Sequence, residues 1–159
     1  MDRDSFRQIM GLFATGVTVV TTSLRGKLHG ITVNSLTSVS LDPLRLLVCI
    51  DTDSRAHDEI EGAGRFGVNF LRVDQEALSR LFAVSRSPEQ DRLRGVPFRI
   101  GPHGSPLLDD CLAHLECAVA ERFAGGDHTI FLGTVLGGQS GPAGRPLLFY
   151  RGLYHTVVE

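Results

Sequence analysis

Small hydroxyl and amide side chains gather in one stretch of the sequence, which runs from Thr32 to Pro43 and reads T-V-N-S-L-T-S-V-S-L-D-P. The stretch lies between two apolar segments that are typical of strands. Its side chains are neutral hydrogen-bond donors, and together with backbone N–H groups such donors can hold a phosphate or another oxyanion without a lysine. An ordinary polar loop has the same composition, so residue type alone leaves both interpretations open.

The histidines form a second set of chemical groups, but their spacing does not indicate a metal site. Neither H-x-x-x-H nor H-E-x-x-H occurs, and no C-x-x-C accompanies them. We expect five of them to be solvated or held by structural hydrogen bonds: His29, His57, His103, His114 and His155. His128 differs because it follows the glycine-rich turn A-G-G-D, where a side chain can extend into a cleft or stabilise the turn with Asp127. A hydrolase has little support, since no G-x-S-x-G elbow is present.

Residues 62–67 read G-A-G-R-F-G and match the dinucleotide-binding fingerprint letter for letter. That motif works only when a strand precedes it and a helix follows it, because the helix N-terminus must meet the pyrophosphate. Here a helical pattern precedes the glycines and a strand pattern follows them. We therefore predict a helix-to-strand turn, and the sequence does not indicate a Rossmann fold.

The elements that position these groups are short, and strands predominate. Helices are predicted at Ser5–Phe13, at Arg55–Glu61 behind the N-cap Ser54, and at Gln75–Ala83, where Leu78, Leu81 and Phe82 share one side. Strands are predicted at Val17–Leu24, Leu28–Val33, Leu44–Ile50, Phe66–Leu71, around Leu115–Val119, at Thr129–Leu136 and at Leu147–Tyr150. Turns are expected at Arg25-Gly26 and at Gly125-Gly126, whose glycines supply positive φ angles. Residues 84–106 are expected to form a long loop with one helical turn around Glu89–Leu93.

This order of elements defines the expected fold class. Seven short strands without regular strand–helix–strand alternation indicate a mainly β protein, an antiparallel barrel with a few short helices. The apolar strand Leu44–Ile50 is expected to be buried on both faces. A chain of 159 residues is of the size of one domain, so we take residues 1–159 as a single unit.

Composition narrows the class of partner and the compartment. The net charge of −2 argues against nucleic-acid binding, and no apolar run approaches the about 18 residues of a membrane span. The N-terminus lacks the apolar region of a signal peptide, so we expect a cytoplasmic protein. The three cysteines, Cys49, Cys111 and Cys117, are expected to be buried free thiols.

The polar stretch and its surroundings resemble the flavin reductase-like family. The resemblance starts at G-I-T-V-N-S-L-T-S-V-S-L-D-P and continues through L-R-L-L-V-C-I and D-T-D-S-R-A-H. It extends to the opening F-R-Q-I-M-G-L-F-A-T-G-V-T-V-V-T-T, to R-F-G-V-N-F-L, to G-G-D-H-T-I-F-L-G-T-V and to P-L-L-F-Y-R-G-L-Y. These segments follow the family's order over nearly the whole chain. The sequence departs from the common pattern at Leu36, where phenylalanine is frequent, and at Thr134, where glutamate is frequent.

The resemblance implies an FMN-binding split barrel, an antiparallel split β-barrel, that acts as an NAD(P)H:flavin oxidoreductase. It implies FMN or FAD and NADH or NADPH as cofactors, a homodimer, and a flavin-dependent monooxygenase as the acceptor of reduced flavin. Hydride would pass between the two bound nucleotides, so no catalytic side chain is expected. Two alternatives remain: an FMN-binding electron carrier or sensor, and an enzyme that reduces another substrate with bound FMN.

The resemblance also implies which residues bind these nucleotides. The flavin ring and ribityl chain would contact Thr32, Asn34, Ser35, Leu36, Val39 and Ser40. The ribityl chain and phosphate would lie at residues 51–57, with Asp51, Ser54, Arg55, Ala56 and His57 as candidates and a helix N-terminus to favour the anion. Phe82 would cover the flavin from a partner subunit or serve as a core aromatic, and His128 would contact the nicotinamide nucleotide. Independently of the resemblance, a 2′-phosphate of NADPH would require positive charge, for which Arg86, Arg92, Arg94 and Arg99 are candidates; the alternative is that these arginines form a solvated surface.

Overall fold

The computed structural model describes residues 1–83 and 95–158. The helical turn expected around Glu89–Leu93, and the candidates Arg86, Arg92 and Arg94, lie outside these residues. One antiparallel sheet contains most of the described chain, in the order β3-β2-β6-β9-β10-β5-β4. Its strands are β2 (Thr18–Leu24), β3 (Lys27–Val33), β4 (Thr37–Leu41), β5 (Leu44–Asp51), β6 (Arg65–Phe70), β9 (Ala113–Ala124) and β10 (His128–Ser140).

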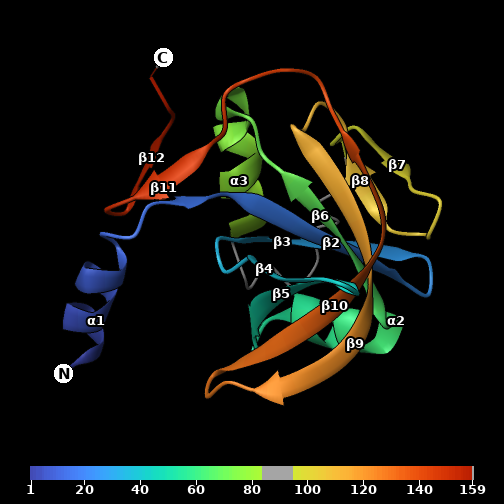
Figure 1. The fold of residues 1–159 in the computed structure, drawn as a ribbon, viewed down its shortest axis with the longest axis horizontal. Coiled ribbons are helices and arrows are strands. Elements are labelled where there is room, and N and C mark those ends of the chain that lie inside the picture. The colour runs from blue at the N-terminus through green and yellow to red at the C-terminus, as the bar shows by residue number, and fades with distance from the viewer. Residues whose placement is uncertain (84–94, 159) are drawn as a thin grey trace.

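The sheet curls on itself, as Figure 1 shows, and β3 and β5 come into contact across it. Two small antiparallel sheets complete the β structure. One contains β1 (Thr15–Gly16), β11 (Leu148–Tyr150) and β12 (Leu153–His155), and the other contains β7 (Phe98–Ile100) and β8 (Pro106–Leu108). The mainly β, antiparallel split-barrel architecture predicted from the sequence is therefore confirmed.

Three short helices accompany the sheets: α1 (Arg3–Met10), α2 (Arg55–Ala63) and α3 (Glu76–Ala83), the last preceded by a 3₁₀ turn, η1 (Val73–Gln75). Ser54 caps α2 as predicted, since its hydroxyl accepts the His57 N–H at 3.2 Å. Gly64 ends α2 at φ 65° and leads directly into β6, which confirms the helix-to-strand turn at residues 62–67. No helix in the described part of the chain has the length and apolarity to span a membrane.

The core is divided into two clusters. The first lies between α2 and the sheet and includes Ile50, Phe66 and Phe131. The second lies where α3 and the sheet of β1, β11 and β12 pack against the large sheet, and it includes Phe82 and Leu147. Each cluster joins residues from strands and helices that are distant in sequence, so the two clusters hold the curled sheet together.

Strand β5 differs from the prediction that both of its faces are buried. Leu46, Val48 and Ile50 are buried, whereas Leu47 and Cys49 on the other face are only half-buried. Side chains alternate between the two faces of a strand, and only one face of β5 meets the core. The other face is therefore left for a pocket.

Four strands lie in or next to segments that were not predicted as strands. These are β4 within the polar stretch, the β7–β8 hairpin in and next to the loop at 84–106, and β12 in the C-terminal tail. Two details also differ: Gly126 alone has a positive φ in the β9–β10 turn, and Leu81 is 42% exposed while Phe82 is buried. Each of these features depends on a pairing or packing partner from elsewhere in the chain.

Candidate flavin and nicotinamide site

A pocket of about 1000 Å³ opens on the outward face of β5. Its walls are the chain from Arg7 to Thr18, the start of β4, the half-buried face of β5 and residues around Leu147 and Phe149. Most of this wall is apolar, and among the described residues that line it only Arg7 and Cys49 have titratable side chains. The pocket can hold a large planar apolar group, but its wall offers no acid–base pair.

The polar stretch contributes one corner of the pocket, with Asn34, Ser35, Leu36 and Thr37 in its wall. The Ser35 hydroxyl donates to the Cys49 carbonyl at 2.9 Å and accepts the Cys49 N–H at 3.0 Å. This pair of hydrogen bonds lies two residues beyond the Thr37–Leu47 pair, and it extends the β4–β5 contact in that direction. Ser35 therefore fixes the corner, and the exposed Asn34 side chain is left to face a ligand.

A second polar group at the pocket lacks a partner. The Thr15 hydroxyl is buried and has no hydrogen-bond partner within the described structure. A buried hydroxyl in this state costs free energy unless a ligand or water satisfies it. Together with Asn34 it supplies the neutral polar contacts that the edge of a flavin or the amide of a nicotinamide requires, so the residues present fit these groups.

Cys49 corrects the expectation of three buried thiols. Cys111 and Cys117 are fully buried, and burial raises the pKa of Cys111 to about 11 and that of Cys117 to about 12. Cys49 lines the pocket and is half-buried, and desolvation raises the pKa of its thiol above the ordinary value. At neutral pH it therefore presents a neutral, polarisable wall to a ligand.

The β9–β10 hairpin carries His128 on the sheet face that also bears Cys49, although His128 is not among the described lining residues of the pocket. In the β5–β10 ladder His128 pairs with Asp51 and Ile130 pairs with Cys49, and directly paired residues share one face of a sheet. His128 is thus on the same face as Cys49, two positions nearer the hairpin tip. Its Nδ1 lies 2.7 Å from the Asp127 carboxylate, and this hydrogen bond lowers the pKa of Asp127. The imidazole is 43% exposed, so its other nitrogen can meet a ligand.

The turn at residues 51–57 uses most of its polar groups internally. The Ser54 hydroxyl, in addition to capping α2, donates to the Asp51 carbonyl at 2.7 Å, and its side chain is buried. Asp51 accepts the Asp53 N–H at 2.8 Å, and Arg55 lies 3.5 Å from the Glu59 carboxylate. The turn itself contains two carboxylates, Asp51 and Asp53, and one arginine, Arg55. A phosphate contact from Arg55 and the backbone of this turn stays a prediction.

Other predicted site residues have structural roles. The Thr32 hydroxyl donates to the Ser79 carbonyl at 2.7 Å, and Ala56 is packed in the first core cluster. Phe82 is wholly buried in the second cluster, against Gly30, where an added Cβ would lie 2.8 Å from its ring. In this chain it packs as a core aromatic, which is one of its two predicted roles, and a flavin contact from a partner subunit stays a prediction.

The pocket also includes residues that were not predicted from the sequence. Cys49 and Leu47 belong to a strand predicted to be buried, and the chain from Met10 to Gly16 belongs to the opening family motif, for which no ligand contact was predicted. A half-exposed strand usually shows polar residues at every second position. In β5 the second face bears Leu47 and Cys49, which are apolar, so this signal is missing. Val39 and Ser40 lie farther along β4, outside the described wall of the pocket, and their flavin contacts stay predictions.

No metal site competes with this assignment: the described residues contain no group of three or more potential metal ligands. Arg99 lies 3.8 Å from the Asp109 carboxylate, and both side chains are about half exposed. A contact between this arginine and a 2′-phosphate stays a prediction.

Comparison with known families and proteins identifies the family of the chain. The family model described as "Flavin reductase like domain" matches residues 10–157. The chain is 41% identical over 159 residues to an NADH-dependent FAD reductase of Streptomyces globisporus, covering 99% of this chain and 87% of that protein. It is 41% identical over 162 residues to an NADH-dependent FMN reductase of Streptomyces nodosus subsp. asukaensis, covering 99% and 86%.

A solved structure gives the same result for the fold. The styrene monooxygenase flavin reductase of Pseudomonas putida S12 superposes with a TM-score of 0.86 at 35% sequence identity. The alignment covers 97% of this chain and 97% of that chain. The similarity is thus both global in structure and well above the level at which only a fold is shared.

Proposed function

The chain belongs to the flavin reductase-like family, and we propose that it is an NADH:flavin oxidoreductase that supplies reduced FMN or FAD to a flavin-dependent monooxygenase. One observation carries the proposal: a pocket of about 1000 Å³ with apolar walls, neutral polar groups and no acid–base pair among its described lining residues. When bound, the nicotinamide and the flavin supply the hydride chemistry themselves.

The task of the chain is to bind, orient and exclude water. Leu47, Cys49 and Phe149 provide apolar surface on which planar rings are desolvated. Asn34 and Thr15 supply neutral hydrogen-bonding groups, so they orient a ring without adding charge. His128 extends from the neighbouring hairpin on the same face and would hold the nicotinamide nucleotide. Orientation of this kind lowers the barrier because the reacting atoms must approach to about 3–3.5 Å.

The decisive experiment is steady-state oxidation of NADH with free FMN or FAD in excess over the protein. The proposed reductase turns over many equivalents of flavin. An electron carrier or sensor with tightly held FMN would show the flavin spectrum but no such turnover. The same assay with NADPH tests the coenzyme, and we expect NADH to be preferred because the similar reductases of Streptomyces globisporus and Streptomyces nodosus are named as NADH-dependent.

Alanine at Asn34 and Ser35 is expected to weaken flavin affinity by about one to two decades for the pair, since each neutral hydrogen bond contributes roughly 0.5–1.5 kcal/mol. The single variants should differ. Asn34→Ala should lower affinity at an unchanged melting temperature, whereas Ser35→Ala should lower both, because its hydroxyl holds the Cys49 backbone. Flavin titration and thermal denaturation measure the two effects. An unchanged flavin dissociation constant in the double variant would refute this corner of the site.

His128→Ala is expected to reduce kcat/KM for NADH by about ten-fold, equivalent to roughly 1–2 kcal/mol of transition-state stabilisation. Flavin affinity should hardly change, because the proposed flavin contacts lie in other segments. If His128 only stabilises the turn with Asp127, melting temperature and flavin affinity would fall together while the KM for NADH stayed constant. Measuring all three quantities on this variant decides between the two roles.

We propose further that the protein acts as a homodimer. Helix α1 contains no buried residue, and it stands away from the sheets in Figure 1. Its apolar side chains Phe6 and Ile9 are 57% and 53% exposed, and Phe13 just beyond it is 70% exposed. An eight-residue helix is marginal in water without a packing partner. A second copy of the chain is the partner that would cover it.

Sedimentation at micromolar concentration is expected to show a species of twice the 17.3 kDa chain mass. The double substitution Phe6→Ser and Ile9→Ser should shift it towards a single chain, because burying these side chains is worth about 1.5–3 kcal/mol each. Neither residue lines the pocket within the described structure. A wild-type species of 17.3 kDa would contradict the dimer.

The free state of all three described cysteines supports a reducing compartment, and we infer that the protein acts in the cytoplasm.

A further inference from the structure

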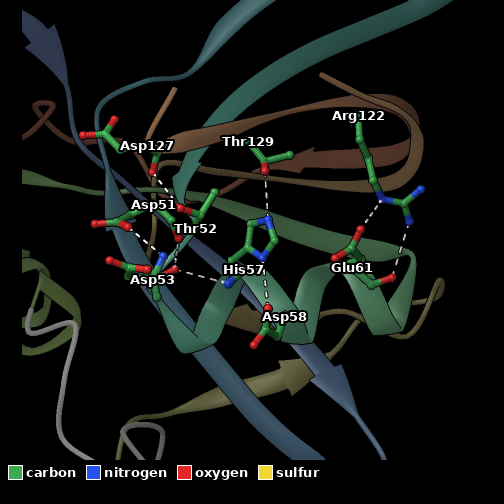
Figure 2. A network of polar contacts seen from close by, with 10 residues as sticks. Asp51, Thr52, Asp53, His57, Asp58, Glu61, Arg122, Asp127 and Thr129 are labelled. Atoms are coloured by element: carbon green, nitrogen blue, oxygen red, sulfur yellow. Dashed lines mark hydrogen bonds and ion pairs between the residues drawn. The ribbon is translucent and has the colours of Figure 1, made fainter. Parts of the chain in front are cut away.

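Three hydrogen bonds join the turn at residues 51–57 to the β9–β10 hairpin (Figure 2). The backbone N–H and the hydroxyl of Thr52 both donate to the Asp127 carbonyl, at 3.0 and 3.1 Å. Five residues after Thr52, in the first turn of α2, the His57 Nε2 lies 2.8 Å from the Thr129 hydroxyl. These contacts link the beginning of α2 to both sides of His128, at positions 127 and 129.

The His57 ring is held on all sides. Its Nδ1 lies 3.1 Å from the Asp58 carboxylate, and its ring centroid is 5.5 Å from that of Phe131. A carboxylate can only accept, so Nδ1 bears the proton, and in the neutral ring Nε2 accepts from the Thr129 hydroxyl. With 13% of its side chain exposed and both nitrogens engaged, His57 has no ring nitrogen left for a phosphate.

Successive side chains of β10 point to opposite faces of the sheet, so the adjacent residues His128 and Thr129 have different surroundings. His128 pairs with Asp51 on the pocket face, and Thr129 pairs with Ile50 on the face that α2 covers. A shift of Thr129 relative to α2 therefore moves His128 relative to the pocket, since both are fixed to the same strand. We infer that His57 and Thr129 are positioning residues that hold His128 at its working distance from the nicotinamide.

A second contact between α2 and the β9–β10 hairpin, the ion pair of Arg122 and Glu61, serves as a control. Arg122 of β9 lies 3.6 Å from the Glu61 carboxylate near the other end of α2, as Figure 2 shows. Both side chains are about half exposed, at 42% and 53%, so solvent screens the pair and its contribution is small. The half-buried His57–Thr129 contact is therefore the one expected to set the position of the hairpin tip.

This inference rests on the proposed function, and the test uses Thr129→Val, which removes the hydroxyl and retains a β-branched side chain. We expect kcat/KM for NADH to fall about three- to ten-fold, the effect of one lost hydrogen bond, with flavin affinity within two-fold of wild type. Thr129→Ser should restore the wild-type value. Arg122→Gln, the matched control, should change it less than two-fold.

A double-mutant cycle separates positioning from mere stabilisation. If Thr129 acts through His128, then Thr129→Val should have less than a two-fold effect on kcat/KM once His128→Ala is present, because coupled residues are not additive. Independent, multiplicative losses in the two backgrounds would overturn the inference. So would a Thr129→Val variant with wild-type kcat/KM, or one whose flavin affinity and melting temperature fall in parallel with it.

Hydrogen exchange of the ligand-free protein supplies a readout without turnover. The Thr52 N–H bonds to the Asp127 carbonyl, so its exchange should accelerate in Thr129→Val and stay unchanged in Arg122→Gln. Equal exchange in both variants would refute the anchoring role. A wild-type protein that failed to oxidise NADH with free flavin would instead refute the proposed function, and the exchange result would still decide whether Thr129 fixes the hairpin.

Discussion

Replacing Phe82 with alanine is expected to lower the free energy of unfolding by about 3–5 kcal/mol, because it removes a large aromatic side chain from a packed core. Phe82 is wholly buried with Leu108 and Leu147, and its ring lies against Gly30 of β3. The loss is a substantial share of the roughly 5–15 kcal/mol that a domain of this kind has in total. Denaturant unfolding, with the midpoint and slope compared between variant and wild type, measures it.

The adjacent Leu81 provides the control for this substitution. It belongs to the same helix but is 42% exposed, so Leu81→Ala should cost less than about 1 kcal/mol. Both variants place alanine in the same helix, where differences in helix propensity stay below about 0.7 kcal/mol, so most of the difference between them reports burial. If Phe82→Ala instead kept its stability and lost flavin affinity, the ring would have to serve a partner's site, and the core assignment would be wrong.

Replacing Cys49 with phenylalanine is expected to weaken flavin binding by about 100-fold or more, equivalent to roughly 2.7 kcal/mol. The side chain lies on the pocket face of β5, so a large ring there would occupy the space proposed for the flavin. The free energy of unfolding should change little, because this face of β5 does not pack in the core and the neighbouring residue on it, Leu47, already has a large side chain. Flavin titration and the melting temperature together measure the result.

Cys49→Ser is the matched control, since it keeps the size of the side chain and should leave the flavin dissociation constant within about three-fold, a change of roughly 0.7 kcal/mol. It also tests whether the thiol itself matters. Undiminished flavin affinity and turnover in Cys49→Phe would place the flavin elsewhere. The turn at residues 51–57 and the exposed side of β4 would then be the regions to search.

Local interactions explain which features of the fold were predictable. The start of α2 at Ser54 and its end at Gly64 depend on a cap and a left-handed glycine within a few residues of the helix. The Arg25-Gly26 turn is of the same kind, with both residues at positive φ. The antiparallel β class followed from the number and spacing of apolar segments, and the ordered family motifs indicated flavin reduction.

The site was predictable in part, and the division follows from strand geometry. Asn34, Ser35 and Leu36 were identified from their stretch and do line the pocket. The prediction that Cys49 is buried was wrong, because the register of β5 with its neighbouring strands decides which of its two faces meets the core. A shift of one residue in register exchanges the two faces, and the sequence of β5 alone does not specify it.

By itself, the sequence determined the fold class, the family and the segments from which the site is built, since these depend on local patterns and on the order of motifs. Tertiary structure decided that Phe82 is core, that Cys49 faces the pocket and that His57 Nε2 contacts Thr129 within the protein. The register of β5 with β10 also places His128 on the pocket face and Thr129 against α2. The physical reason is that each of these roles depends on contacts between residues far apart in the chain, which no local pattern encodes.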